Sequence, residues 1–223
     1  MNLQQIKGAY DVIVSLGSAC NPAMQLRRHN LRSFSGPLDW NVSLSLSDVN
    51  RLLKNKFDSF MELKNMHLLD ETHFFLNDGV PVFPNDGSTQ PIKSYFVKDN
   101  HYNIISIHDF PIIPNQDWTV TYPSYKEKLN RRINRFLDKI TKSQSILFVR
   151  WAASYDQAVE LQSILSGIVK GHFNILILYP VEGFQGVSDM NWGIEKVCSV
   201  KVPNIPFDDT TWDYVLNGIT LTN

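Results

Sequence analysis

The chain lacks most of the features that mark secreted or membrane-bound proteins. Its 223 residues include only two cysteines, Cys20 and Cys198, too few for the disulfide framework of a small secreted domain. The amino-terminal segment has no long apolar core like that of a signal peptide, and no stretch approaches the roughly 18 apolar residues of a membrane span. We therefore expect a cytoplasmic protein with reduced thiols.

An excess of charge of one sign is also missing. The sequence has 21 basic and 22 acidic residues and a formal net charge of −1, which provides no overall field to attract nucleic acid or an anionic membrane. A small molecule, a peptide or a glycan is a better match for such a surface. With 43% hydrophobic residues and no internal repeat, the chain is expected to form one domain over residues 1–223.

Apolar segments that alternate with amphipathic segments predict an α/β fold. The expected strands are 12–16, 103–108, 145–151, 174–179 and 195–202. The order strand, helix, strand, helix, strand after residue 125 favours crossover connections. We expect a mainly parallel sheet with helices on both faces, in three layers.

Capping residues mark where two of the helices begin. Asn21 is the expected N-cap of a helix that runs from Pro22 to about residue 30. Ser154 and Gln157 have the spacing of a capping box before the helix that ends at Gly171. Residues 65–105, by contrast, have little periodicity and contain two Asn-Asp-Gly turns, so this region is expected to be a hairpin or irregular insertion.

Cys20 is the most informative residue for function. It follows an apolar strand that turns at Gly17, and it stands directly before a helix, where the positive end of the helix dipole favours a thiolate. The turn also leaves amides of Ser18 to Cys20 available for an anion or an oxyanion. The alternative is a cysteine that only packs. We assign Cys198, in the middle of a strand, to the core.

A catalytic thiol needs a base, and the ends of other strands provide candidates. His108 and Asp109 end one strand, and Arg150 and Trp151 end another. If these strands belong to one parallel sheet, their ends share a rim with Cys20. Cys20 and His108 could then form a nucleophile and base pair.

Two carboxylates compete for the role of orienting His108. Asp109 is adjacent in sequence, but on a continuing strand it would face the opposite side. Asp39, in a Pro-Leu-Asp-Trp segment, is the other candidate. Either carboxylate could instead cap a turn.

Other site types have less support. Residues 70–73 (Asp-Glu-Thr-His) with His67 lack a second His or Cys at metal-site spacing, so we expect no metal and no cofactor. Three basic residues of the 125–140 helix, Arg131, Arg132 and Arg135, are expected to lie on a solvated face.

Several segments together resemble a bacterial family of unknown function described as putative papain-like cysteine peptidases. The matching segments are 15–28 (Ser-Leu-Gly-Ser-Ala-Cys-Asn-Pro to Arg-Arg), 36–40 (Gly-Pro-Leu-Asp-Trp), 108–110 (His-Asp-Phe), 131–136 and 148–150. The resemblance spans about residues 11–151. It implies a thiol nucleophile at Cys20 and a histidine partner at His108, and it makes a papain-like α+β fold the alternative to the three-layer arrangement.

The sequence leaves three functions open. The first is a thiol-dependent hydrolase or acyltransferase that uses Cys20 and His108. The second is a transferase or modifying enzyme for a sugar or nucleotide-sugar of a surface-glycan pathway, without covalent catalysis. The third is a non-enzymatic binding module. The candidate substrate-binding residues at the rim are Gly17, Ser18, Trp40, Arg150 and Trp151.

Overall fold

The fold is built around a five-stranded, mainly parallel sheet. The computed structural model describes residues 1–222. The sheet has the order β11-β12-β10-β9-β2, in which the last four strands are parallel and β11 is antiparallel. Its strands are β2 (Val12–Ser15), β9 (Ser145–Trp151), β10 (His172–Val181), β11 (Ser188–Asp189) and β12 (Val197–Pro203). The predicted α/β class with a mainly parallel sheet is confirmed.

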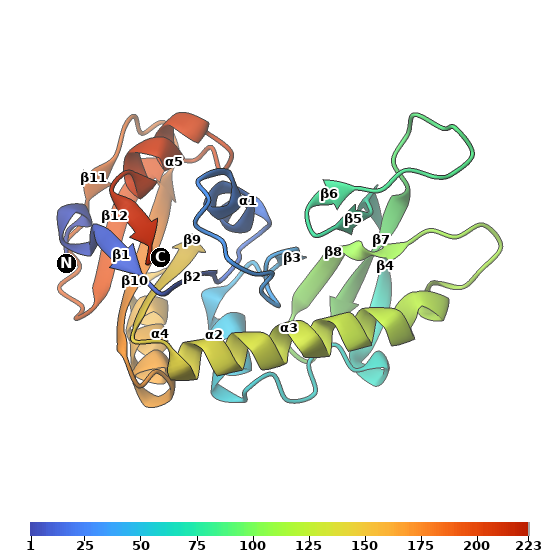
Figure 1. Ribbon diagram of the computed structural model, residues 1–223, viewed down its shortest axis with the longest axis horizontal. Helices are drawn as coiled ribbons and strands as arrows, with labels where there is room; N and C mark the ends of the chain where they lie inside the picture. Colours follow the sequence, from blue (N-terminus) through green and yellow to red (C-terminus); the bar gives the residue numbers. More distant parts are fainter. Residues whose placement is uncertain (223) are drawn as a thin grey trace.

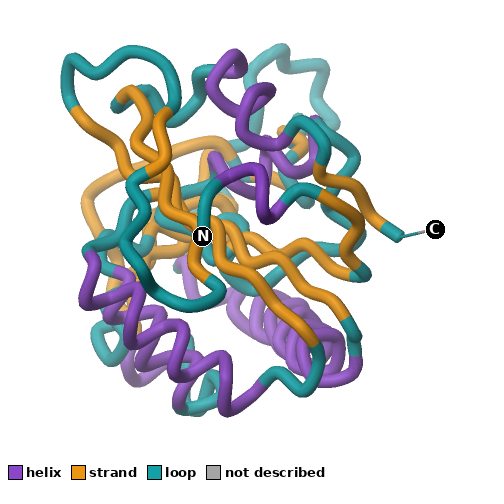
Figure 2. The backbone as a smooth tube through the Cα atoms, turned by 90° about the vertical axis from the view of Figure 1, so that its left-hand side faces the viewer, coloured by secondary structure: helices purple, strands orange, loops and turns teal. Residues whose placement is uncertain are grey.

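Helices cover both faces of this sheet (Figures 1 and 2). The helices are α1 (Asn21–Arg28), α2 (Leu46–Lys54), α3 (Tyr122–Lys142), α4 (Tyr155–Ile168) and α5 (Asp209–Leu216). Side chains alternate along the strands, so Phe148 packs in the cluster that includes α3 and α4, whereas Val149 packs in the cluster that includes α1 and α5. The result is three layers.

Residues 41–111 add a second, antiparallel sheet. Its order is β3-β8-β7-β4, with strands β3 (Asn41–Val42), β4 (Met66–Phe74), β7 (Lys93–Asp99) and β8 (Ile104–Pro111). A small hairpin, β5 (Leu76–Asn77) and β6 (Val80–Pro81), follows β4. The insertion expected at about 65–105 is therefore mostly regular sheet.

The remaining elements are short. They are the parallel pair β1 (Gly8–Tyr10) and β13 (Ile219–Leu221), and the 3₁₀ turns η1 (Leu3–Ile6), η2 (Leu63–Asn65) and η3 (Trp118–Thr121).

Helix α3 joins the two sheets. It runs along the parallel sheet at its carboxyl-terminal end and along the antiparallel sheet at its amino-terminal end (Figure 1). Phe136 packs edge-on against Phe57, with ring centroids 5.4 Å apart, and Tyr125 packs on Phe110 of β8, with centroids 4.3 Å apart. These side chains belong to one continuous cluster of buried residues, so the two sheets share a core.

The caps follow the sequence with one shift. Ser154 and Gln157 form the predicted capping box of α4. At α1, however, Cys20 occupies the N-cap position and Asn21 is the first helical residue. The thiol is therefore part of the helix boundary itself.

Candidate functional site

A tight turn connects β2 to α1 and presents Cys20. Gly17 and Ser18 have positive φ angles of 78° and 96°. A Cβ on Gly17 would lie 3.3 Å from both the Leu38 carbonyl oxygen and the Ser43 hydroxyl, so glycine allows the turn to pack closely there. The Ser18 amide donates to Ser43 Oγ at 3.3 Å, and the Ser43 amide donates to the Ser18 carbonyl at 2.9 Å.

The Arg150 side chain holds this turn by hydrogen bonds to the residues around it. Its buried guanidinium donates to the carbonyl oxygens of Leu16 (3.0 Å), Ser43 (2.6 Å) and Ala152 (3.1 Å), and to Ser43 Oγ (2.7 Å). Burial lowers its pKa to about 9. Because this value is still above neutral pH, the guanidinium remains charged. Arg150 was expected to bind substrate at the rim; its donors instead hold the turn and the segment after β3.

Cys20 is half-buried at the start of α1. Within residues 1–222, the amide of Ala19 donates no hydrogen bond and the amide of Cys20 interacts only with its own thiol, whereas the Ser18 amide is occupied. Burial raises the pKa of the thiol, and its own backbone amide opposes that effect. Burial outweighs the amide, so the pKa is shifted upward, opposite to the direction that the sequence suggested.

His108 lies within β8 at an irregularity of the ladder. The register of β7 with β8 shifts between Tyr95 and Val97, and the extra residues of β8 include His108. Such bulges turn a side chain away from its regular direction. The expectation that His108 sits at the end of a strand of the parallel sheet is wrong, because β8 belongs to the antiparallel sheet.

A backbone carbonyl fixes the tautomer of His108. Nδ1 lies 2.7 Å from the Phe74 carbonyl oxygen, which only accepts, so Nδ1 carries the proton and Nε2 keeps the lone pair. The His73 ring packs edge-on against the imidazole, with centroids 4.9 Å apart. Burial lowers the pKa of His108, so the ring is neutral at pH 7.

Neither candidate carboxylate bonds to His108. Asp39 accepts from Arg32 Nε and from the Gly36 amide, each at 2.8 Å. Asp109 accepts from Lys128 Nζ of α3 at 2.6 Å. The orienting role that the sequence assigned to one of these carboxylates is filled by the Phe74 carbonyl.

The proposed pair is not in contact in this structure. Among the described residues, no hydrogen bond joins Cys20 to His108. The two are linked indirectly, because Ser43 bonds to the turn before Cys20 and directly follows β3, which pairs with β8 at Asn41 and Ser106.

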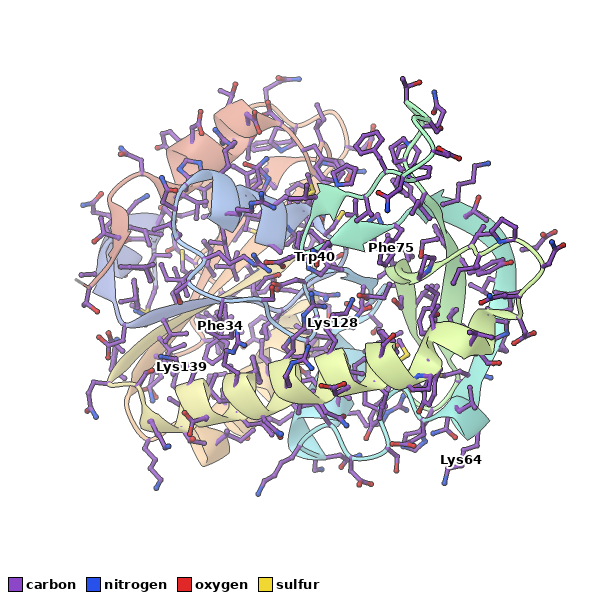
Figure 3. All side chains as sticks on the ribbon, turned by 45° about the vertical axis from the view of Figure 1, so that its right-hand side comes forward. Phe34, Trp40, Lys64, Phe75, Lys128 and Lys139 are labelled. Carbon is purple, nitrogen blue, oxygen red and sulfur yellow. The ribbon has the colours of Figure 1, made fainter. Side chains whose placement is uncertain are left out.

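The two tryptophans expected at the rim have buried rings. Trp151 stacks on Trp212 of α5 at 5.9 Å, with an interplanar angle of 26°. Trp40 is 2% exposed, and its indole nitrogen donates to Asp78 at 3.3 Å. Figure 3 shows Trp40 next to the β5–β6 hairpin, with Lys128 on α3 below it in that view.

Two clefts near these elements were not anticipated from the sequence. One, of about 330 Å³, lies at the carboxyl ends of β9 and β10 and is lined by residues that include Leu44, Ser154 and Tyr179. The other, of about 630 Å³, is largely apolar and is lined by residues that include Phe75, which follows the residue that holds His108, and Pro111, which ends β8. Their lining residues come from segments far apart in the sequence.

Three further expectations can be compared with the structure. Cys198 is fully buried in the core, and burial raises its pKa to about 12. Within residues 1–222, no group of three or more His, Cys, Asp or Glu side chains is placed to hold a metal ion. Arg132 is only 9% exposed and faces Asp78 and Asp109, so its assignment to a solvated face was wrong.

Comparison with known proteins gives one family and one relative. A model of the family described as "Putative papain-like cysteine peptidase (DUF1796)" matches residues 11–181. An uncharacterized protein of Acanthamoeba polyphaga mimivirus is 30% identical over 141 residues, which cover 62% of this chain and 60% of the viral protein. The chain thus spans less than two thirds of that relative, whose viral source does not support a bacterial origin. No solved structure matches.

No helix in the part of the chain that the structure describes combines the length and the apolar character needed to cross a membrane.

Proposed function

The chain belongs to the family described as "Putative papain-like cysteine peptidase (DUF1796)", whose match covers most of its length, and from this premise we propose a thiol-dependent hydrolase or acyltransferase. Cys20 is the nucleophile and His108 is the general base. The observation that carries the proposal is the hydrogen bond from His108 Nδ1 to the Phe74 carbonyl, because it leaves Nε2 as the proton acceptor on a neutral ring.

In the proposed reaction, Cys20 forms and then releases an acyl bond, and His108 accepts and returns the protons. His108 Nε2 takes the Cys20 proton as Sγ attacks the acyl carbon, and the amides of Ala19 and Cys20 donate to the oxyanion. The bond to the leaving group then breaks, and His108 gives the proton to that group. Water, for hydrolysis, or another nucleophile, for transfer, then attacks the acyl carbon as His108 Nε2 removes its proton; the bond from that carbon to Cys20 Sγ breaks, and His108 returns the proton to Sγ.

The proposal requires the two side chains to approach each other when substrate binds. Catalytic hydrogen bonds are often long or absent without substrate and form in the complex. The raised pKa of Cys20 is compatible with this order of events, since a neutral thiol beside a neutral imidazole transfers its proton only when the two meet. The apolar cleft beside Phe75 favours an apolar acyl or peptide group as the substrate.

The test is the pH dependence of Cys20 alkylation in a Cys198→Ser protein. We expect His108→Ala to slow alkylation at neutral pH and to raise the apparent pKa of the thiol in the presence of an acyl substrate analogue. His172→Ala, at an exposed position that begins β10, is the matched control and should change neither. Equal alkylation profiles for the two histidine variants would contradict the proposal.

A sugar or nucleotide-sugar enzyme is the second candidate, and the aromatic residues beside the smaller cleft favour it. Tyr155 and Tyr179 each pack against Trp192 with centroids 6.0 Å apart, where their rings could stack on a sugar. In this case Cys20, which does not line that cleft, would take no part in catalysis. Full activity in a Cys20→Ala protein, together with stabilisation by a nucleotide-sugar, would favour this candidate over the first.

A further inference from the structure

The tip of the β5–β6 hairpin places a carboxylate among donors from a distant segment. Asp78 Oδ1 accepts from Arg32 Nη2 at 2.6 Å, from Trp40 Nε1 at 3.3 Å and from the Ser35 hydroxyl. Its other oxygen lies 3.4 Å from Arg32 Nη1. One carboxylate thus receives donors from three side chains of the loop before β3.

These donors are held in place without Asp78. The Arg32 side chain is 7% exposed, its Nε donates to buried Asp39 at 2.8 Å, and its guanidinium lies 5.3 Å from the centre of the Trp40 ring. Trp40 is itself buried. The donors are therefore fixed by the core, and the carboxylate they receive is 47% exposed on a hairpin.

Arg132 adds donors that the chain leaves unused. Its side chain is 10% exposed, and its nitrogens lie 3.9 Å from Asp78 and 3.7 Å from Asp109. Within residues 1–222 its guanidinium donates no hydrogen bond and makes only these two longer ion-pair contacts. A guanidinium normally forms two short hydrogen bonds with an oxyanion, so an anion larger than a carboxylate would reach it from the place of Asp78.

The charges around this place balance only when Asp78 is included. Apart from the exposed Arg27, which contacts only the hairpin backbone, the cluster contains three cations, Arg32, Lys128 and Arg132, and two buried carboxylates, Asp39 and Asp109. Asp78 is the third carboxylate. Without it, one positive charge in a largely buried region would lack a counterion, which is costly unless another anion takes its place.

The β5–β6 hairpin has few interactions that would prevent its tip from moving away from Arg32 and Trp40. Its two strands have two residues each, and a short hairpin has little stability of its own. Apart from the carboxylate, its tip is held by Arg27 Nη1, which donates to the Asp78 carbonyl at 2.9 Å, and by the close packing of Gly79 on Trp40.

We propose that Arg32, Ser35, Trp40 and Arg132 form a binding site for a small oxyanion, phosphate, sulfate or carboxylate, and that Asp78 occupies this site as a built-in plug. The hairpin lifts when an external oxyanion replaces the Asp78 carboxylate. This site goes beyond the proposed function and does not depend on Cys20.

The test compares thermal stability with inorganic phosphate, sulfate or acetate against sodium chloride at equal ionic strength. Asp78→Asn keeps a residue that tolerates the positive φ of 50° but removes the charge. We expect phosphate to raise the Tm of this variant by about 3–5 °C at ten times the dissociation constant, and the Tm to keep rising with the logarithm of the phosphate concentration above it. A larger effect of phosphate and sulfate than of acetate would assign a tetrahedral oxyanion, and a larger effect of acetate would assign a carboxylate.

Matched variants separate this effect from general salt stabilisation. Asp86→Asn changes the same residue in the other Asn-Asp-Gly turn, where the carboxylate receives only the Ser88 amide. It should behave like the wild-type protein. Adding Arg132→Gln to Asp78→Asn should abolish the phosphate effect.

A second way to open the site leaves its charges unchanged. A Cβ at position 79 would lie 2.4 Å from Trp40 Cη2, so Gly79→Ala should push the tip away and make the protein responsive to phosphate as well. The proposal is overturned if neither Asp78→Asn nor Gly79→Ala responds more than Asp86→Asn. Because the measurement needs no activity, this outcome is distinct from a failure of the Cys20 proposal.

Discussion

At the scale of single residues, burial decides the protonation of the candidate catalytic groups. Burial raises the pKa of Cys20 and lowers the pKa of His108, so it favours the neutral form of each. Phe74 contributes a carbonyl oxygen, which selects the tautomer of His108 without adding a charge. The resting site therefore consists of a thiol and a neutral imidazole.

The lowered pKa of His108 predicts a specific pH dependence of stability. In the unfolded chain the imidazole titrates near about 6.5, and in the folded protein it titrates lower. As the pH falls below about 6.5, the unfolded state binds this proton first, so the free energy of unfolding decreases. We expect His108→Gln to flatten this decrease in urea titrations between pH 7 and pH 5.

The control for this prediction is His172→Gln, which changes an exposed histidine at the first residue of β10 in the parallel sheet. It should keep the wild-type slope. Parallel slopes for all three proteins would mean that His108 titrates alike in the folded and unfolded states.

At the scale of elements, Arg150 joins three segments that are far apart in the sequence. From β9, its guanidinium donates to the carbonyl oxygens of Leu16 after β2, Ser43 after β3 and Ala152. A buried guanidinium without a carboxylate partner is stabilised only by these hydrogen bonds. The position of the turn at Gly17 therefore depends on a strand that occurs more than a hundred residues later.

This arrangement predicts that Arg150→Met destabilises the protein by about 3 kcal/mol, because buried carbonyl oxygens lose their donors. Urea unfolding would measure the change. Arg135→Met replaces an exposed arginine of α3 and should have little effect. Equal stability of the two variants would show that the carbonyl groups find other partners.

At the scale of the whole molecule, α3 and the shared core couple the two sheets. Phe136 lies in a cluster that extends from β2 and β9 to Phe110 of β8. We expect a single cooperative unfolding transition over both sheets, as for one domain. Phe136→Ala should cost about 3–5 kcal/mol through lost burial and a cavity.

The measurement is calorimetry together with near-ultraviolet circular dichroism. The whole transition should shift to lower temperature in Phe136→Ala, whereas Asn134→Ala, on the exposed face of the same helix, should leave it in place. Two separate transitions, with only one of them shifted, would show that the sheets unfold independently.

Local sequence patterns predicted many of the secondary-structure elements and identified the residues that could take part in catalysis. Periodicity and caps identified the parallel strands, α3 and α4, and the turn chemistry at Gly17 placed Cys20 at a helix start. These features depend on neighbours within a few residues, which is why they can be read from the chain.

Contacts between distant segments required the folded chain. The pairing of β3 with β8 joins residues 65 positions apart, the Phe74 carbonyl lies 34 positions from His108, and Arg132 faces Asp78 from 54 positions away. Backbone carbonyls and ladder irregularities have no signature in side-chain identity, because every residue has a carbonyl group. Burial, which sets the pKa of Cys20 and His108, is likewise a property of how the layers pack.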